Sequence, residues 1–216
     1  MTSTPKILII GPGRTGTTTL TNAISSILKL SDIHEPWNYR EPADTQIKYP
    51  EDIKNYGVIK CLPNQIPYQF RGSKSRGEVG TETLINFYVE LQKYFDYTIL
   101  LNRRQRIEIA KSAAYQRQYG GTGTWHEQYF IPDESKLDLS NFDWIDSVCD
   151  LAEELSTILD TPITWYEDLY SGDKKLISKV IKKWGFNIDL ESLYEYIDPK
   201  HRYRKTDKKQ IINKVI

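Results

Sequence analysis

The segment 6–20, KILIIGPGRTGTTTL, contains residues suited to holding a negatively charged group. Three glycines, Gly11, Gly13 and Gly16, lie between a short apolar run and a stretch with a helical pattern. Glycines let the backbone curl so that several N–H groups converge, and the positive end of a following helix points to the same place. The segment therefore predicts an anion-binding loop that opens a helix.

This loop lacks the lysine of a nucleotide triphosphatase. The spacing of Gly11 and Gly16 matches the first part of a Walker A motif, but Thr17 takes the lysine position and Thr18 the Ser/Thr position. The positive charge is carried by Arg14 instead. A guanidinium can bind two oxygens at once, whereas lysine provides a point charge. The loop is therefore expected to bind an anion in a different way from a kinase or ATPase loop.

A second group of basic residues follows the apolar run 97–102, in the sequence NRRQRIEIAKS. Arg104 and Ser112 are eight positions apart, which on a helix is a rise of about 12 Å. The two side chains converge only if Arg104 lies on the loop and folds over the helix. Arg103 and Arg106 flank it and could take its place. Arginines at the positive end of a helix are unfavourable unless an anion is present, so this segment also favours a ligand.

Apolar runs alternate with segments of helical period, which is typical of a parallel sheet covered by helices. We expect an α/β fold of three layers, with a mostly parallel central sheet flanked by helices as in P-loop nucleoside triphosphate hydrolases, and a single domain over residues 1–216. The expected strands are 6–10, 57–62, 97–102 and 162–167. The expected helices are 17–30, 81–95, 105–118, 143–159 and 174–184. The irregular segments 31–56, 63–80 and 119–141 are expected to cover a site at the carboxyl ends of the strands.

Composition narrows the classes of partner. The 216 residues contain 29 Lys and Arg and 29 Asp and Glu, so no overall field favours nucleic acid or an anionic membrane. The first residues form neither a signal peptide nor a spanning helix, and a cytoplasmic location is expected. Cys61 and Cys149 are the only cysteines. Their spacing suggests neither zinc nor a disulfide framework, and we expect two buried thiols.

Four segments together resemble the sulfotransferases that use 3′-phosphoadenosine 5′-phosphosulfate (PAPS). The loop RTGTT is similar to the loop that binds the 5′-phosphosulfate in that family, and LLNRRQRIEIAKSAAYQRQ is similar to its 3′-phosphate motif. The late segment ITWYEDLYSGDKKLISKVIKKWGF resembles the family's late strand, turn and helix. DIHEPWNY resembles the Glu-Pro segment found after the first helix in several branches. The four segments are spread over most of the chain and occur in the same order as in that family.

The resemblance implies transfer of a sulfuryl group from PAPS to a hydroxyl or amine of a carbohydrate, glycolipid or small metabolite. PAPS carries two separate anionic groups, so the family uses two anion sites and needs no metal. Arg14 is also expected to stabilise charge in the reaction. The implied donor-binding residues are Arg14, Thr15, Gly16, Thr17, Thr18, Arg104, Ser112 and, from a basic segment resembling the loop that covers the nucleotide, Arg204.

Transfer to a hydroxyl also requires a general base, because the acceptor loses a proton as the sulfur is attacked. The resemblance implies Glu35 for this role, and His34 and His126 are alternatives because histidine titrates near neutral pH. Lys60 lies near the end of an expected buried strand, where a charge usually faces a polar site. It is expected to stabilise the sulfuryl oxygens or the acceptor.

Two other hypotheses about the function remain open. A divergent P-loop kinase would use ATP and magnesium, and Asp168, which follows the strand expected at 162–167, could hold the metal. A non-catalytic nucleotide-binding module would keep the anion loop without the reaction. Neither the acceptor nor the oligomeric state follows from the sequence.

Overall fold

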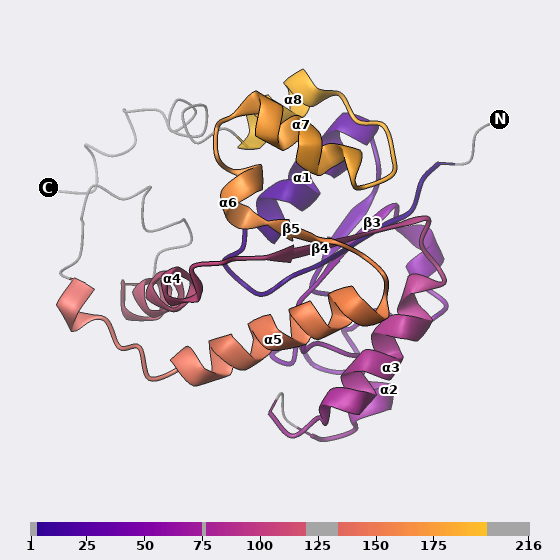
Figure 1. Cartoon of the computed structure of the whole chain (residues 1–216). Coiled ribbons are helices and arrows are strands. Elements are labelled where there is room, and N and C mark those ends of the chain that lie inside the picture. The colour runs from indigo at the N-terminus through magenta and orange to yellow at the C-terminus, as the bar shows by residue number, and fades with distance from the viewer. Residues whose placement is uncertain (1–3, 75–76, 120–133, 198–216) are drawn as a thin grey trace, which may run out of the picture.

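Five parallel strands form the central sheet of the computed structural model, which describes residues 4–74, 77–119 and 134–197 (Figure 1). Their order across the sheet is β2-β3-β1-β4-β5, and all four neighbouring pairs are parallel. The strands are β1 (Ile7–Ile10), β2 (Asp32–His34), β3 (Val58–Cys61), β4 (Tyr97–Asn102) and β5 (Ile163–Trp165). An α/β fold with a parallel sheet is thus confirmed.

Strand β1 lies at the centre of the sheet and explains the apolar run at the start of the chain. Its four residues are fully buried. Ile7 is in register with Val58 of β3 on one side and with Tyr97 of β4 on the other. A parallel strand covered on both faces needs apolar side chains at every position, because successive residues point to opposite faces.

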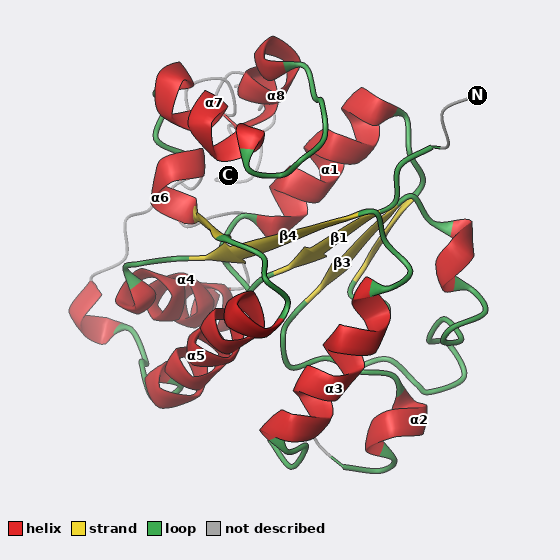
Figure 2. Cartoon of the chain, turned by 45° about the vertical axis from the view of Figure 1, so that its right-hand side comes forward, coloured by secondary structure: helices red, strands yellow, loops and turns green. Residues whose placement is uncertain are grey.

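Helices cover both faces of the sheet. Helices α1, α7 and α8 lie on one face and α3 and α5 on the other, while α4 lies beyond the strand ends (Figures 1 and 2). The main helices are α1 (Thr17–Leu28), α3 (Thr81–Gln92), α4 (Arg106–Tyr119), α5 (Phe142–Ile158), α7 (Lys174–Lys182) and α8 (Leu190–Ile197). The short helical turns are α2 (Tyr68–Arg71), α6 (Tyr166–Leu169), η1 (Ile53–Asn55) and η3 (Glu134–Lys136).

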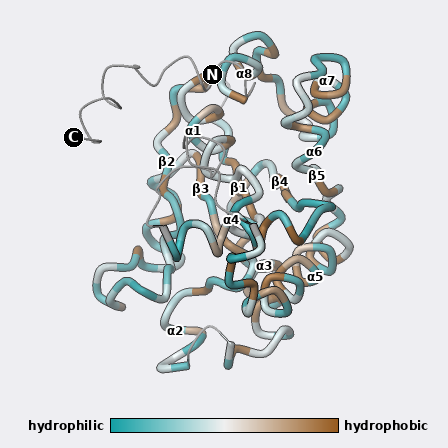
Figure 3. The backbone as a smooth tube through the Cα atoms, turned by 90° about the vertical axis from the view of Figure 1, so that its left-hand side faces the viewer, coloured by the Kyte–Doolittle hydropathy of each residue, from teal (hydrophilic) through white to brown (hydrophobic). Residues whose placement is uncertain are grey.

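The two faces of the sheet have separate hydrophobic cores. Ile7 and Ile9 belong to the core under α1, α7 and α8, whereas Leu8 and Ile10 belong to the core under α3 and α5. Figure 3 shows hydrophobic and hydrophilic residues along both α5 and α7, as expected for helices with one face on a sheet. Among the helices in the described ranges, none is long and apolar enough for a membrane span.

The connections to α1 and α3 diverge at the carboxyl end of the sheet. The chain leaves β1 for α1 on one face, and it leaves the neighbouring β3 for α3 on the opposite face. In open parallel sheets, ligands bind where neighbouring connections diverge in this way. The first glycine-rich loop and the segment after β3 both lie at this point.

The four expected strands and five expected helices are present, with ends that differ by a few residues. Strand β2 was not expected, because DIH has only one apolar residue and lies in a segment whose sequence predicts irregular structure. It forms because it adds to the edge of β3, with Ile33 opposite Ile59. Helices α2, α6 and α8 were not expected either; two of them are only one turn long.

Candidate functional site

The glycine-rich loop joins β1 to α1 and is held against both neighbouring strands. The backbone N–H of Gly11 donates to the carbonyl oxygen of Cys61 at 3.2 Å, which ties the loop to the end of β3. A Cβ atom at Gly11 would lie 2.9 Å from Thr17 Cγ2 and 3.0 Å from atoms of Leu101 in β4. Only glycine fits this position without displacing neighbours.

Two residues of the loop have left-handed backbone conformations, Arg14 with φ 68° and Gly16 with φ 79°. Arginine rarely adopts this conformation, and non-glycine residues held in it are concentrated at functional sites. The Tyr170 hydroxyl donates to the carbonyl oxygen of Gly16 at 2.7 Å. A Cβ atom at Gly16 would lie 2.5 to 2.6 Å from the Tyr170 ring. Tyr170, which follows α6, therefore fixes the loop at the start of α1.

Helix α1 begins in a way that leaves its positive end available to an anion. Gly16 is the N-cap, and within the described residues no side chain caps the helix and no acidic residue lies in its first turn. The hydroxyl of Thr15 donates to the carbonyl oxygen of Pro12, inside the loop, at 2.7 Å. Thr17 is buried and Thr18 is exposed. First-turn N–H groups need a partner from outside the helix, and an anion can provide it.

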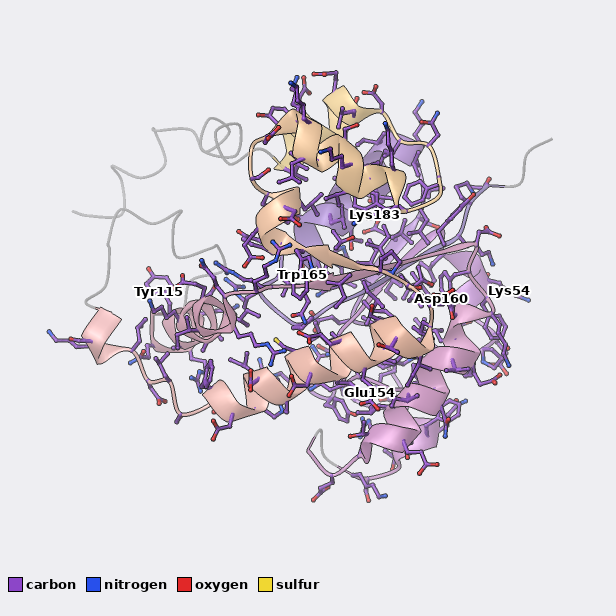
Figure 4. All side chains as sticks on the ribbon, in the orientation of Figure 1. Lys54, Tyr115, Glu154, Asp160, Trp165 and Lys183 are labelled. Carbon is purple, nitrogen blue, oxygen red and sulfur yellow. The ribbon has the colours of Figure 1, made fainter. Side chains whose placement is uncertain are left out.

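The structure brings Arg14 and Ser112 together. The Nε of Arg14 donates to the Ser112 hydroxyl at 2.9 Å. Ser112 lies in α4 with only 4% of its surface exposed. The anion loop and the serine of the second basic segment thus meet at one place, beyond the carboxyl ends of β1 and β4. Figure 4 shows α4, on which Tyr115 is labelled, beyond the end of the sheet.

Arg104 is turned to another partner. Its two terminal nitrogens donate to the two carboxylate oxygens of Asp168 at 2.7 and 2.8 Å, and its guanidinium lies 5.0 Å from the ring centre of Trp165. Trp165 lies where β5 leads into α6 (Figure 4). The hydrogen bond raises the pKa of Arg104 and lowers that of Asp168. In this structure Arg104 therefore does not converge on Ser112, and Asp168 is held by an arginine.

The other two arginines of the segment have different environments. Arg106 donates to Asp146, Asp150 and Glu153 of α5 at 2.6 to 2.7 Å. Burial alone lowers the pKa of Arg106, but these hydrogen bonds outweigh burial and raise it above the ordinary arginine range. Arg106 therefore joins α4 to α5.

Arg103 lies at the end of β4 beside the aromatic residues that fix the loop. Its guanidinium is 4.5 Å from the ring centre of Tyr166, whose ring is 4.7 Å from that of Tyr170. The side chain is 11% exposed and lies 4.0 Å from Glu108. Its Nε is buried and has no hydrogen-bond partner among the described residues. Such an unpaired buried donor is unusual in a protein.

Glu35 lies at the end of β2 in a cluster of polar side chains. Lys60 of β3 donates to one carboxylate oxygen of Glu35. Gln65 and Asn38 donate to the other oxygen, at 3.1 and 3.3 Å. Lys60 is almost completely buried and Glu35 is partly exposed. Glu35 also has a left-handed backbone, with φ 49°, and its N–H donates to the carbonyl oxygen of Lys60 at 2.7 Å. Several elements therefore fix the orientation of this carboxylate.

The remaining candidates are placed as follows. His34 is in β2, and its Nε2 lies 3.0 Å from Asp32. His126 and Arg204 lie outside the described residues. Cys61 and Cys149 are buried free thiols, as expected. Burial is the largest cause that raises their pKa, to about 12 for Cys149.

The sequence alone missed Gln65, Asn38 and Tyr170. Gln65 follows the end of β3 in the sequence KCLPNQ, and polar residues directly after a buried parallel strand are a signal that could have identified it. Asn38 and Tyr170 gave no such signal, because their roles depend on contacts with Glu35 and Gly16.

No family model matches the chain, and no curated protein matches it at a significant level. In residues 4–74, 77–119 and 134–197, no group of three or more His, Cys, Asp or Glu side chains is arranged to hold a metal ion.

Proposed function

We propose that the chain is a PAPS-dependent sulfotransferase with the P-loop type of fold, and that it transfers a sulfuryl group to a hydroxyl or amine of an acceptor. The observation that carries this proposal is the hydrogen bond between Arg14 and Ser112. The sequence suggested these residues separately, from two motifs for opposite ends of one donor. A kinase loop would not require a serine of α4 beside an arginine of the loop.

The residues of the first loop fit a 5′-phosphosulfate. The first turn of α1 offers N–H groups that no side chain of the described residues caps, and Arg14 offers a guanidinium beside them. Thr17 and Thr18 start the helix and would bind the same group with backbone N–H groups or hydroxyls. Fixed donors of this kind lower the barrier to transfer when they point to the oxygens on which charge develops.

The 3′-phosphate has two candidate arginines. Arg104 could bind it only after releasing Asp168, to which it donates two hydrogen bonds. Arg103 has a weaker competing contact, an ion pair with Glu108 at 4.0 Å. We therefore assign the 3′-phosphate to Ser112 and Arg103, with Arg104 as the alternative.

Glu35 would act as the general base and Lys60 as the group that stabilises negative charge. In the reaction, an acceptor oxygen forms a bond to sulfur while the bond from sulfur to the phosphate oxygen breaks, and Glu35 takes the acceptor proton. PAPS supplies the sulfuryl group and leaves as adenosine 3′,5′-bisphosphate. Lys60, Gln65 and Asn38 hold the carboxylate in place. A fixed base contributes roughly 10²- to 10⁴-fold to a rate.

Thermal unfolding tests the donor assignment first. We expect adenosine 3′,5′-bisphosphate without metal to raise the melting temperature more than ATP with magnesium does. Transfer from labelled PAPS to a panel of hydroxyl and amine acceptors then tests the reaction. Preference for ATP with magnesium would overturn the proposal in favour of a kinase. Binding of the bisphosphate with no transfer to any acceptor would favour a non-catalytic module.

A further inference from the structure

Asn64 has a buried side chain whose hydrogen-bonding groups are both unused within the described part of the chain. The residue is 5% exposed. Neither Nδ2 nor Oδ1 has a hydrogen-bond partner among the described residues. Most buried polar side chains in proteins are hydrogen-bonded, and each exception needs a reason. An amide that is fixed in the protein interior with both ends unpaired is a costly arrangement unless something else binds it.

Asn64 is close in the sequence to residues that contact both parts of the candidate site. It follows the carboxyl end of β3, three residues after Cys61, whose carbonyl oxygen binds the N–H of Gly11 in the anion loop. The next residue, Gln65, donates to Glu35 at 3.1 Å. Asn64 therefore lies in the segment that connects the anion loop to the proposed general base.

Hydrogen bonds hold the backbone of the segment on both sides of Asn64. The Tyr88 hydroxyl contacts the carbonyl oxygens of Leu62 and Gln65, on either side of Asn64, at 2.5 and 2.9 Å. The N–H of Gln65 donates to the carbonyl oxygen of Leu62 at 3.0 Å, which closes a turn around Pro63 and Asn64. Because these contacts use backbone groups, they fix the turn without using the amide of Asn64.

We propose that the side chain of Asn64 binds the acceptor and selects a hydroxyl-rich, carbohydrate-type molecule. An amide presents donors on one atom and an acceptor on the other. A carboxylate or phosphate only accepts and would leave Oδ1 unpaired; an ammonium only donates and would leave Nδ2 unpaired. Hydroxyl groups both donate and accept, so two neighbouring hydroxyls satisfy both ends of the amide. This inference rests on the proposed function, because it takes the side of Glu35 as the acceptor side.

The first test is the stability of variants without ligand. Removing an unsatisfied buried amide removes its cost, so Asn64→Leu, which has a similar size, is expected to melt at the same temperature as the wild type or higher. Asn64→Ala serves as the second variant if leucine does not fit. Exposed Asn86 of α3 provides the control, as Asn86→Leu and Asn86→Ala. If both Asn64 variants melt well below the matched controls, Asn64 has a structural partner and the proposal is overturned.

The second test is transfer from labelled PAPS to the methyl glycosides of glucose, galactose, mannose and N-acetylglucosamine, with cyclohexanol as the acceptor with one hydroxyl. We expect the wild type to prefer a glycoside. Asn64→Ala should lower kcat/KM for that glycoside by roughly tenfold or more, without changing transfer to cyclohexanol or the affinity for adenosine 3′,5′-bisphosphate. Preference for cyclohexanol, no transfer to any glycoside, or an unchanged kcat/KM would overturn the inference.

Binding of adenosine 3′,5′-bisphosphate to the wild type distinguishes a failure of the proposed function from a failure of the Asn64 assignment. If the wild type does not bind adenosine 3′,5′-bisphosphate, the proposed function fails, and this inference fails with it. If the bisphosphate binds and the glycosides are not used, only the assignment of Asn64 fails.

Discussion

The guanidinium Nε of Arg14 donates a 2.9 Å hydrogen bond to the hydroxyl of Ser112, 98 positions away in the sequence. Through this bond the loop after β1 is joined to the middle of α4. The two residues that the proposal assigns to opposite ends of a nucleotide donor are thus in direct contact. Substituting both residues measures whether they contribute to donor binding together or independently.

Replacing Arg14 is expected to weaken binding of adenosine 3′,5′-bisphosphate. A hydrogen bond to a charged group contributes about 1.5–3 kcal/mol, so Arg14→Ala should raise the Kd by roughly tenfold to a hundredfold. Arg14→Lys keeps the charge but loses the planar donors, and it should recover only part of the affinity. Calorimetry of both variants, with Ser112→Ala and the double variant, measures the coupling. Fully additive effects of Arg14→Ala and Ser112→Ala would show that the two residues bind independently.

Gly16→Ala is expected to destabilise the protein strongly. Its φ of 79° is unfavourable for alanine, and the new Cβ would lie 2.5 to 2.6 Å from the Tyr170 ring. The backbone strain alone should lower the free energy of unfolding by about 1–3 kcal/mol. Gly13→Ala is the matched control, because no atom lies within 4 Å of its added Cβ. Urea denaturation compares the two; equal stabilities would contradict the contact with Tyr170.

Substitutions of Arg103 and Arg106 are expected to change different properties, bisphosphate affinity for Arg103 and the free energy of unfolding for Arg106. Arg106→Met leaves three carboxylates of α5 without their arginine, and it should lower the free energy of unfolding by roughly 1–3 kcal/mol. Affinity for adenosine 3′,5′-bisphosphate should remain. Arg103→Met should mainly lower bisphosphate affinity, because the ion pair that it loses, with Glu108 at 4.0 Å, is longer than those of Arg106. Unfolding and binding measurements on both variants decide; a loss of bisphosphate affinity in Arg106→Met alone would reverse the assignment.

Glu35→Gln is expected to reduce kcat by roughly 10²- to 10⁴-fold. The amide cannot take the acceptor proton, but it still fills the space of the carboxylate. Affinity for adenosine 3′,5′-bisphosphate should not change, because Glu35 lies on the acceptor side. Single-turnover transfer from labelled PAPS measures the chemical step. If activity is kept in this variant and lost in His34→Gln, the base is His34.

The pair of Arg104 and Asp168 is expected to stabilise the fold only above acidic pH. The hydrogen bond to Arg104 lowers the folded-state pKa of Asp168 below its ordinary 3.8. The contribution is therefore present above 3.8 and is lost as the pH falls through the folded-state value. Because the pair is partly exposed, it is worth less than about 1 kcal/mol. The difference in unfolding free energy between wild type and Asp168→Asn should shrink as the pH is lowered below 3.8. A constant difference would show that the charge of Asp168 does not matter.

The buried framework could be predicted because its signal is local. Strand β1 is apolar at every position, and α5 repeats apolar residues at helical spacing, so each segment contains the pattern of its own structure. Strand β2 has no such pattern. Its three residues become a strand only because β3 provides an edge, and the expected irregular segment 31–56 contains no sign of that pairing.

The candidate site was predictable in its residue types and less so in its pairings. Glycine spacing identified the anion loop, but the hydrogen bond between Arg14 and Ser112 was not predicted, because the two motifs assign these residues to separate anion sites. The direction in which Arg104 points could not be predicted, because it depends on Asp168 after β5, 64 positions away. Neighbouring arginines such as Arg103 and Arg104 look alike in sequence, and only packing distinguishes the largely buried side chain of Arg103 from the exposed side chain of Arg104.

All five strands run in one direction, so the proposed reacting groups lie together at the carboxyl ends of the strands. Exposed Lys54 lies near the amino ends of the strands, where it lines an opening of about 290 Å³ with Pro5 and Gly57 (Figure 4). A fluorescent dye or a sensor surface attached through the exposed thiol of a Lys54→Cys variant, with Cys61 and Cys149 buried, would leave the carboxyl end of the sheet facing solution. Oriented attachment of this kind lets donor and acceptor be added in turn, so the order in which the two substrates bind can be read from one immobilised sample.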